Sequence, residues 1–335
     1  MTIKDIARLS GCGVATVSRV LNHYPDVSEA TRARVMAVVE KYGFQPNSNA
    51  RHLKQQVGRS IAIIVKGTRN LLFADMVELA QLRIQQKEKE AAVYYLDEDG
   101  DEVAFALRVC REFKPLAIIF LGGDLENFRR GFAPITVPCV LLTNSAAQLD
   151  FPNLSSVTTD DMAAAEEAVD HLIDRGHDHV GIVGGNLSST QISYQRMLGC
   201  RSSFEKHGLP FDDQGRCEPC RFSMEGAYAA TGRLLDRHPD LTAIFAISDV
   251  IALGVIRALG DRGHRVPEDI SVMGFDGIPY GEYSTPRLTT IRQDVERMVE
   301  RGTEVLLERL EKTLPPVHET VPFRLIEGES VACRQ

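Results

Sequence analysis

Three charged side chains in the second half of the chain stand where a small ligand could be held. Asp249 and Asp276 each end an apolar run, and Arg196 lies early in an expected helix. Two aromatic residues, Phe73 and Phe222, could stack on the face of a ring. Carboxylates and a guanidinium form bidentate hydrogen bonds, so this set suits a polyhydroxylated ligand. Taken singly, each residue also has a structural explanation, because an aspartate after a strand often caps a helix and a lone phenylalanine is usually core.

The chain offers little support for catalysis. No glycine-rich nucleotide-binding pattern follows an expected strand, and no Ser/His/Asp set or metal-ligand cluster has convincing spacing. His177, in Arg175-Gly176-His177, is the most tempting catalytic candidate, but a histidine after a helix-ending glycine is better explained by the helix C-terminus. We therefore expect no enzymatic activity, no cofactor and no metal site.

The seven cysteines are an odd number scattered over a long chain, which favours free thiols over a disulfide framework. Cys217 and Cys220 form the only close pair. A zinc site would need a second Cys or His pair at matching spacing. A redox motif would follow a strand near the start of a βαβ unit. We expect a structural role for this pair.

The elements that must position the ligand-binding candidates are apolar strands alternating with helical segments. Continuous β-branched runs separated by crossover helices indicate a parallel sheet covered on both faces. The pattern occurs before about residue 160 and repeats after it, which predicts an α/β body of two doubly wound parallel-sheet lobes with a ligand cleft at the carboxyl ends of the strands. The pattern does not place the last helix, about 295–312, or the final strands in either lobe. The expected strands are 61–65, 92–96, 117–121, 140–142, 180–183, 243–247 and 271–275.

The N-terminal residues have the pattern of a small all-α domain. Residues 14–22, read as a helix, place Val17, Val20 and Leu21 on one face and leave polar side chains for a partner. Three short helices with a tight turn between the first two predict a helix-turn-helix, whose second helix enters the DNA major groove. Considered alone, 14–22 could equally be an ordinary amphipathic helix. Thr2 with Asp5 indicates the start of the first helix, and Gly11-Cys12-Gly13 breaks it. Ser28 caps the third helix, which has Val35, Val38, Val39 and Tyr42 on one face and is closed by Gly43.

Length and charge agree with this division. A chain of 335 residues suggests two or three domains. The net charge is −8, yet residues 1–58 carry +4 and the remainder −12, as expected when only a basic head touches nucleic acid. No apolar run is long enough to cross a bilayer, and the N-terminus lacks an apolar signal core. We expect a cytoplasmic protein that does not associate with membranes.

The segment after the third helix is polar and basic, with no apolar face of its own. It could be a plain linker. Arg51 and Lys54 beside Leu53 would also suit a segment that becomes ordered on DNA, with Leu53 wedged between base steps in the minor groove.

Three N-terminal runs carry a specific resemblance: Thr2-Ile3-Lys4-Asp5-Ile6-Ala7, then Ala15-Thr16-Val17-Ser18-Arg19-Val20-Leu21-Asn22, then Pro46-Asn47 with Ala50-Arg51 and Leu53. The chain resembles the LacI/GalR family of bacterial transcription regulators over nearly its whole length. The resemblance implies a homodimer on a pseudo-palindromic operator in double-stranded DNA. It also implies groove contacts from Val14, Ala15, Thr16, Ser18, Arg19 and Asn22, phosphate contacts from Thr2, Ser28, Thr31 and Asn47, and hinge contacts from Ala50, Arg51 and Leu53.

The same resemblance implies an effector pocket in the cleft of a periplasmic-binding-protein-like body. Its positions match Phe73, Thr190, Arg196, Phe222, Asp249 and Asp276 in this sequence. The chain departs from the family pattern at Ser248, where Asn is frequent, and at Gly277, where a second Asp is common. The identity of the effector therefore stays open, with a sugar or sugar derivative as the expected class.

These observations lead to a domain division and a functional hypothesis. We expect a helix-turn-helix domain at 1–46, a hinge at 47–59, and an effector-binding and dimerisation domain at 60–335. Within the last, the N-lobe takes 60–159 plus 293–320 and the C-lobe takes 160–292 plus 321–335. The leading hypothesis is a ligand-controlled repressor. A transport solute-binding protein and a nucleotide-dependent enzyme are the alternatives, and the tail after Thr313 lacks the apolar heptads of a coiled-coil tetramer.

Overall fold

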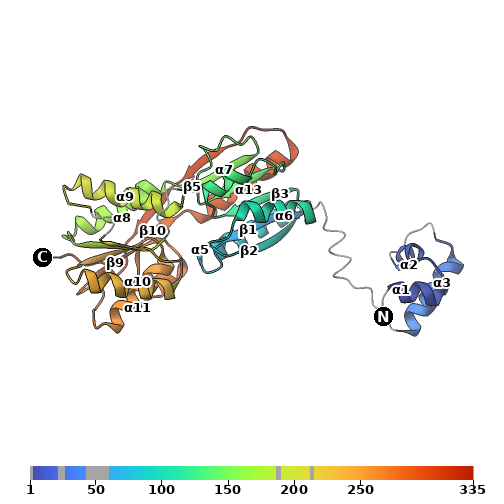
Figure 1. The fold of residues 1–335 in the computed structure, drawn as a ribbon, viewed down its shortest axis with the longest axis horizontal. Coiled ribbons are helices and arrows are strands. Elements are labelled where there is room, and N and C mark those ends of the chain that lie inside the picture. Colours follow the sequence, from blue (N-terminus) through green and yellow to red (C-terminus); the bar gives the residue numbers. More distant parts are fainter. Residues whose placement is uncertain (1–2, 22–26, 43–59, 186–189, 212–214, 335) are drawn as a thin grey trace. The chain divides into compact units, whose positions relative to one another are not determined.

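The computed structural model describes residues 3–21, 27–42, 60–185, 190–211 and 215–334, and Figure 1 shows its elements. The chain divides into two compact units, Met1–Val57 and Gly58–Gln335, which are considered separately. No described helix is both long enough and apolar enough to span a membrane.

The smaller unit contains the three predicted helices, α1 (Ile3–Ser10), α2 (Val14–Leu21) and α3 (Glu29–Lys41). Ile6, Val17, Val20 and Val35 are fully buried and hold the helices together. The turn between α1 and α2 depends on Gly11, whose φ of +63° is a left-handed conformation that suits glycine.

The start and end of α3 test two further predictions. Ser28 caps α3 as predicted, because its side chain accepts a hydrogen bond from the Thr31 amide at 3.4 Å. Tyr42, expected on the same helical face as Val35, lies just beyond the end of the helix. The helix ends at Lys41, and Tyr42 is 45% exposed with the Lys41 ammonium 5.5 Å from its ring.

The first lobe of the larger unit is a six-stranded parallel sheet in the order β11-β5-β4-β3-β1-β2. Alternate residues of β1 face opposite layers: Ile61 and Ile63 pack with α5 and α13, and Ala62 and Ile64 with α6 and α7. The elements are β1 (Ser60–Lys66), α5 (Leu72–Gln86), β2 (Glu90–Leu96), α6 (Glu102–Phe113), β3 (Ala117–Leu121), α7 (Leu125–Gly131), β4 (Cys139–Leu142), β5 (Leu154–Thr159), α13 (Val295–Glu311) and β11 (His318–Val321).

The second lobe repeats this architecture with the order β12-β10-β9-β8-β6-β7, where only β12 is antiparallel to its neighbour. Helices α8 and α9 cover one face of the sheet and α10 and α11 the other (Figure 1). The elements are α8 (Asp161–Ile173), β6 (Val180–Val183), α9 (Ile192–Lys206), β7 (Cys217–Glu218), α10 (Met224–Arg237), β8 (Ala243–Ala246), α11 (Asp249–Asp261), β9 (Ser271–Asp276), α12 (Pro279–Glu282), β10 (Thr289–Gln293) and β12 (Phe323–Ile326).

The chain passes between the lobes three times: from β5 to α8, from β10 to α13 and from β11 to β12. The strands at these crossings lie at one end of each sheet, whereas β2 and β7 are the edge strands at the opposite end. The three crossings therefore form an interlobe hinge on one side of the cleft, distinct from the expected hinge segment at 47–59; 'hinge' below means this interlobe hinge. Within the described residues, no chain crossing joins the lobes on the side of β2 and β7.

Two sequence candidates for chemistry have structural roles. The buried His177 ring contacts the Thr242 hydroxyl at 3.1 Å and the carbonyl of Ala332 at 3.0 Å, so it fixes the C-terminal tail against the second lobe. All seven cysteines are free thiols. Cys217 is buried at the start of β7, and burial raises the pKa of Cys220 to about 12, which makes it an unreactive thiol.

Candidate functional site

A cavity of about 80 Å³ lies between the two lobes of the larger unit, at the carboxyl ends of their strands. Both lobes contribute to its wall, so the cavity exists only when they are together. From the first lobe come Lys66, Gly67, Asn70, Leu72, Phe73, Glu98, Gly122, Gly123, Thr143 and Asn144, and from the second come Gln191, Ile192, Arg196, Phe222 and Asp276.

Arg196 is held rigidly at this cavity. Its Nε donates to Asp161 Oδ1 at 2.8 Å, its Nη1 donates to the Ile247 carbonyl, and its Nη2 lies 3.4 Å from Asp276 Oδ1. The guanidinium also stacks over the Phe275 ring, 3.7 Å from its centroid. Four contacts fix the plane of the group, so it presents its remaining hydrogen-bonding capacity in one orientation.

Asp276 lines the cavity beside Arg196, at the end of β9. Gln293 donates to its Oδ1 at 2.8 Å. Burial raises the pKa of Asp276 to about 6, although the Arg196 charge opposes the shift. Its φ of +112° is strained for a residue with a Cβ. A strained, buried carboxyl group facing a cavity is typical of a functional site.

Asp249 does not line this cavity, so the expected ligand contact is corrected to a supporting role. It is fully buried at the start of α11, where Thr290 donates to its Oδ1 at 2.6 Å and the Ile278 amide to its Oδ2 at 2.8 Å. Ser248, not Asp249, caps the helix. Burial, and secondly the Asp276 charge, raise the pKa of Asp249 to about 8. Asp249 connects β10 to the segment that follows Asp276.

Of the other three predicted pocket residues, two line the cavity and one does not. Phe73, at the start of α5, and Phe222, before α10, both line the cavity. Thr190 lies next to the cavity wall without being part of it, and its carbonyl accepts a hydrogen bond from Leu125 at 3.4 Å. Its neighbours Gln191 and Ile192 contribute to the wall instead.

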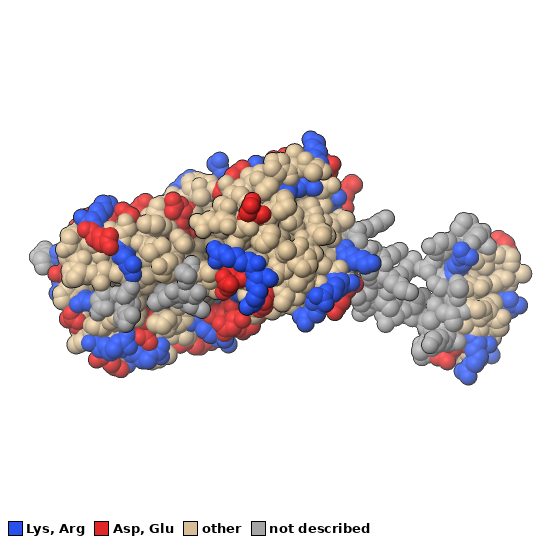
Figure 2. Space-filling model, turned by 45° about the horizontal axis from the view of Figure 1, so that its top comes forward, with Lys and Arg blue, Asp and Glu red and all other residues tan. Residues whose placement is uncertain are grey.

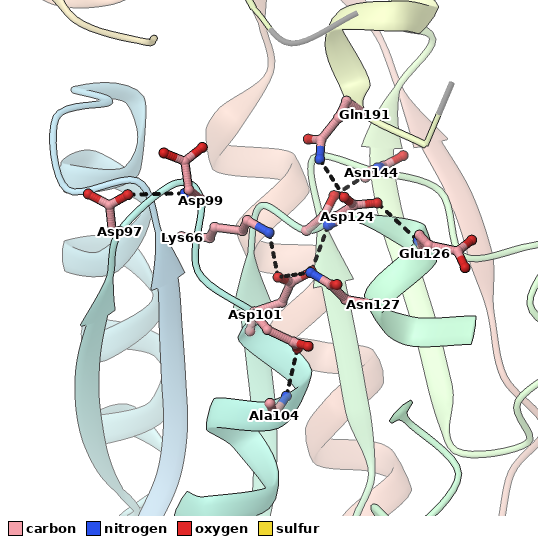
Figure 3. Close-up of polar contacts among 12 residues, drawn as sticks. Lys66, Asp97, Asp99, Asp101, Ala104, Asp124, Glu126, Asn127, Asn144 and Gln191 are labelled. Atoms are coloured by element: carbon pink, nitrogen blue, oxygen red, sulfur yellow. Dashed lines mark hydrogen bonds and ion pairs between the residues drawn. The ribbon is translucent and has the colours of Figure 1, made fainter. Parts of the chain in front are cut away.

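A polar network on the first-lobe side was not predicted. Lys66 Nζ lies 2.5 Å from Glu102 Oε2, and Glu102 also accepts from the Asp124 amide at 2.6 Å and from Asn127 at 3.0 Å. Gln191 reaches across from the second lobe and donates to Asp124 at 2.7 Å, as Figure 3 shows. Lys66 ends an apolar strand just as Asp276 does, and this signal could have identified it.

The charged groups of the lining are therefore paired within the protein: Lys66 with Glu102, Arg196 with two aspartates, and Glu98 with Arg221 at 3.1 Å. The wall therefore provides hydrogen-bonding groups in fixed orientations and two phenyl rings. Groups of three or more potential metal ligands are absent from the described part of the chain.

The DNA-contact candidates of the smaller unit are only partly described. Val14, Ala15, Thr16, Ser18 and Arg19 lie on α2, and Arg19 is exposed. Ser28 and Thr31 are hydrogen-bonded to each other, with 2.9 Å between their hydroxyl oxygens. Outside the described residues lie Thr2, Asn22, Asn47, Ala50, Arg51 and Leu53.

Comparison with known proteins covers both units. Residues 2–47 match the model for bacterial regulatory proteins of the lacI family, and residues 169–331 match that for a periplasmic binding protein-like domain. The chain is 34% identical to the HTH-type transcriptional regulator MalR of Clostridium butyricum, over 98% of this chain and 99% of the relative. It is 31% identical to the regulator GalS of Salmonella typhimurium, over 100% of this chain and 98% of the relative.

Solved structures also match this chain over nearly its whole length. The complex of the transcriptional regulator CelR with cellobiose has a TM-score of 0.71 at 25% identity, covering 98% of this chain and 99% of the other. The lac repressor dimer bound to operator and the anti-inducer ONPF has a TM-score of 0.70 at 22% identity, covering 99% of both chains. At that identity the second match shows the shared fold.

Proposed function

Since the chain belongs to the LacI family of bacterial regulatory proteins, whose members are regulators and not enzymes, we propose that it is a sugar-controlled transcriptional repressor. In this proposal it acts in the cytoplasm as a homodimer on a pseudo-palindromic operator. The observation that carries the proposal is a helix-turn-helix unit in the same chain as a two-lobed body with a polar cavity between its lobes.

The DNA-binding half of the proposal rests on α2. Val17 and Val20 are buried against α1 and α3, so the opposite face of α2 is available to the major groove. Arg19 on this helix is suited to a bidentate contact with guanine. Ser28 and Thr31, at the start of α3, place two hydroxyl groups and a helix N-terminus where a phosphate could bind.

We propose the homodimer from the geometry of DNA recognition. One helix-turn-helix unit makes few base contacts, so specificity requires two half-sites and a two-fold dimer.

The ligand we propose is an uncharged sugar. The charged groups of the lining already have partners, so an anionic ligand would find a cavity without a spare positive charge among the described residues. Hydroxyl groups can share the directed donors and acceptors of Arg196, Asp276 and Gln191, and Phe73 and Phe222 offer apolar faces to a sugar ring. The similarity to MalR, GalS and the cellobiose-bound CelR supports this class.

The proposal is tested in two steps with the full-length protein. First, thermal unfolding is followed with a panel of neutral sugars that includes cellobiose and ribose, and with matched uronic acids. A neutral sugar should raise the melting temperature, since it binds the native state alone. Second, DNA selected from a random pool should contain a pseudo-palindrome, and the same sugar should change the affinity for it. A protein that selects no DNA sequence, or whose DNA affinity is indifferent to every stabilising sugar, would contradict the proposal.

A further inference from the structure

The lobes of the larger unit touch at the side of the cleft that is farthest from the hinge. Edge strands β2 and β7 lie at the ends of their sheets opposite the three chain crossings. The loops that follow them, residues 97–101 and 219–223, meet across the cleft. A rotation about the crossings would move these loops apart more than any other facing part of the lobes.

One arginine makes most of this contact. Arg221 of the second lobe pairs with Asp97, with Glu98 at 3.1 Å and with Asp99 at 3.4 Å. Within the loop contact, this guanidinium offsets the mutual repulsion of the three consecutive carboxylates of the first lobe. The pKa of Asp97 is lowered by the Asp99 amide, which donates to it at 3.1 Å (Figure 3), and by Arg221, so the carboxylate is ionised at neutral pH.

Two further contacts flank this cluster. The Phe222 amide donates to Glu98 Oε2 at 3.2 Å, and both residues line the cavity. Arg69 of the first lobe pairs with Glu225 of the second at 2.9 Å. Figure 2 shows basic and acidic side chains interleaved over the visible face of the larger unit, but these pairs differ from most others because they join the two lobes.

The cavity beside these contacts is closed too tightly for a sugar to enter. Its volume of about 80 Å³ is well below the roughly 300–1,000 Å³ of ligand pockets in general. A ligand must therefore enter through an arrangement in which the lobes stand farther apart. Reaching that arrangement breaks the contacts of Arg221, because they join the two lobes.

We propose that Arg221 and the Asp97–Asp99 loop form an interlobe latch, which holds the lobes closed in the absence of ligand. The latch rests on the proposed function only in that the cavity receives the effector. Because the latched cavity is too small for a sugar, the latch must open before the effector can bind. By favouring the closed arrangement, the latch lowers the apparent affinity for the effector and makes that affinity sensitive to ionic strength.

The test is hydrogen–deuterium exchange of the full-length protein without sugar or DNA, followed by mass spectrometry of peptides covering 97–101 and 219–224. In Arg221→Ala, both peptides should exchange about two- to fivefold faster, as expected for loss of a partly exposed ion-pair cluster. Asp97→Asn/Asp99→Asn, which leaves the cavity-lining Glu98 in place, should show a smaller change in the same peptides. In the native protein, 0.5 M NaCl should shift exchange toward that of Arg221→Ala.

Arg257→Ala is the matched control, because it removes an exposed arginine–aspartate pair that lies within one helix of the second lobe. It should leave both peptides unchanged. The latch is rejected if Arg221→Ala alters only the peptide that contains it, or if neither variant changes the 97–101 peptide. Since no sugar or DNA is present, this result is independent of whether the proposed function holds.

Discussion

At the scale of residues, three buried carboxyl groups and the buried Arg196 guanidinium lie at or behind the cavity wall. Asp161 and Asp276 share Arg196, and Asp249 lies behind them, where a hydroxyl group and a backbone amide donate to it. Burial is the leading cause that raises the pKa of all three. Each carboxyl group is therefore held in a site that disfavours its charged form, and ionisation costs folding free energy.

This arrangement predicts a pH dependence of stability. The folded-state pKa of Asp249, about 8, lies above the ordinary value of 3.8, so the native state binds a proton that the unfolded state releases. Its contribution to stability is fully present below about pH 4, is lost progressively as the pH rises from there through the folded-state pKa of about 8, and is therefore smaller at pH 9 than at pH 6. Urea denaturation should give a free energy of unfolding that is lower at pH 9 than at pH 6, by on the order of 2 kcal/mol.

The control is Asp249→Asn, which cannot ionise. Its free energy of unfolding should change less between the two pH values, and it should be closest to that of the native protein at pH 6. If both proteins lose the same stability between pH 6 and pH 9, the pH dependence originates elsewhere.

At the scale of elements, periodicity was sufficient for the central strands and for the three N-terminal helices. The seven predicted strands correspond to β1, β2, β3, β4, β6, β8 and β9. β5 and β10, near the hinge, were not predicted because they carry Ser and Thr among few apolar residues. β7, at the opposite end of its sheet, was not predicted because it has only two residues. β5 pairs with β11 and β10 pairs with β12, both strands from the end of the chain, and no local pattern records such long-range pairing.

The same limit applies to the site. Arg196, Asp276, Phe73 and Phe222 could be found from their chemical type and position, since Asp276 ends a strand, Phe222 precedes a helix, and Phe73 and Arg196 lie near the starts of helices. Asp249 has the same sequence signal as Asp276, and only the tertiary structure shows that it faces β10 instead of the cavity. Glu102 was missed because a buried acid at the start of a helix is indistinguishable in sequence from an exposed one.

Two glycines test how closely the helices of the second lobe pack. A Cβ on Gly199 of α9 would lie 2.2 Å from the Met162 carbonyl oxygen of α8, a backbone atom that cannot yield. Gly199→Ala should lower the free energy of unfolding by at least about 2 kcal/mol. Gly260→Ala, in α11 with nothing within 4 Å of the new Cβ, should raise it by about 0.4–1 kcal/mol. Thermal and urea denaturation of the pair measure both effects, and equal stability of the two variants would refute the close packing of α8 on α9.

At the scale of the whole molecule, the candidate input and output sites lie in different units. Arg196 and Asp276 are in the larger unit, and α2 is in the smaller one. A ligand can influence DNA binding only if its affinity differs between two arrangements of the protein. A substitution at the cavity should therefore remove the response to sugar without removing DNA binding itself.

Asp276→Asn provides this test. The amide keeps the size of the side chain and can still accept the hydrogen bond from Gln293, but it loses the charge that strengthens bonds to sugar hydroxyls. The loss of a charge-assisted hydrogen bond, about 1.5–3 kcal/mol, should weaken binding of the most stabilising sugar by roughly 10- to 150-fold. Affinity for the selected DNA, measured by fluorescence anisotropy without sugar, should remain that of the native protein. Asp269→Asn, at an exposed aspartate of the same lobe paired with Arg265, is the control and should retain both properties. A variant at 276 that still responds at the native sugar concentration would remove Asp276 from the proposed binding site, because a directed carboxylate contact cannot be lost without a change in affinity.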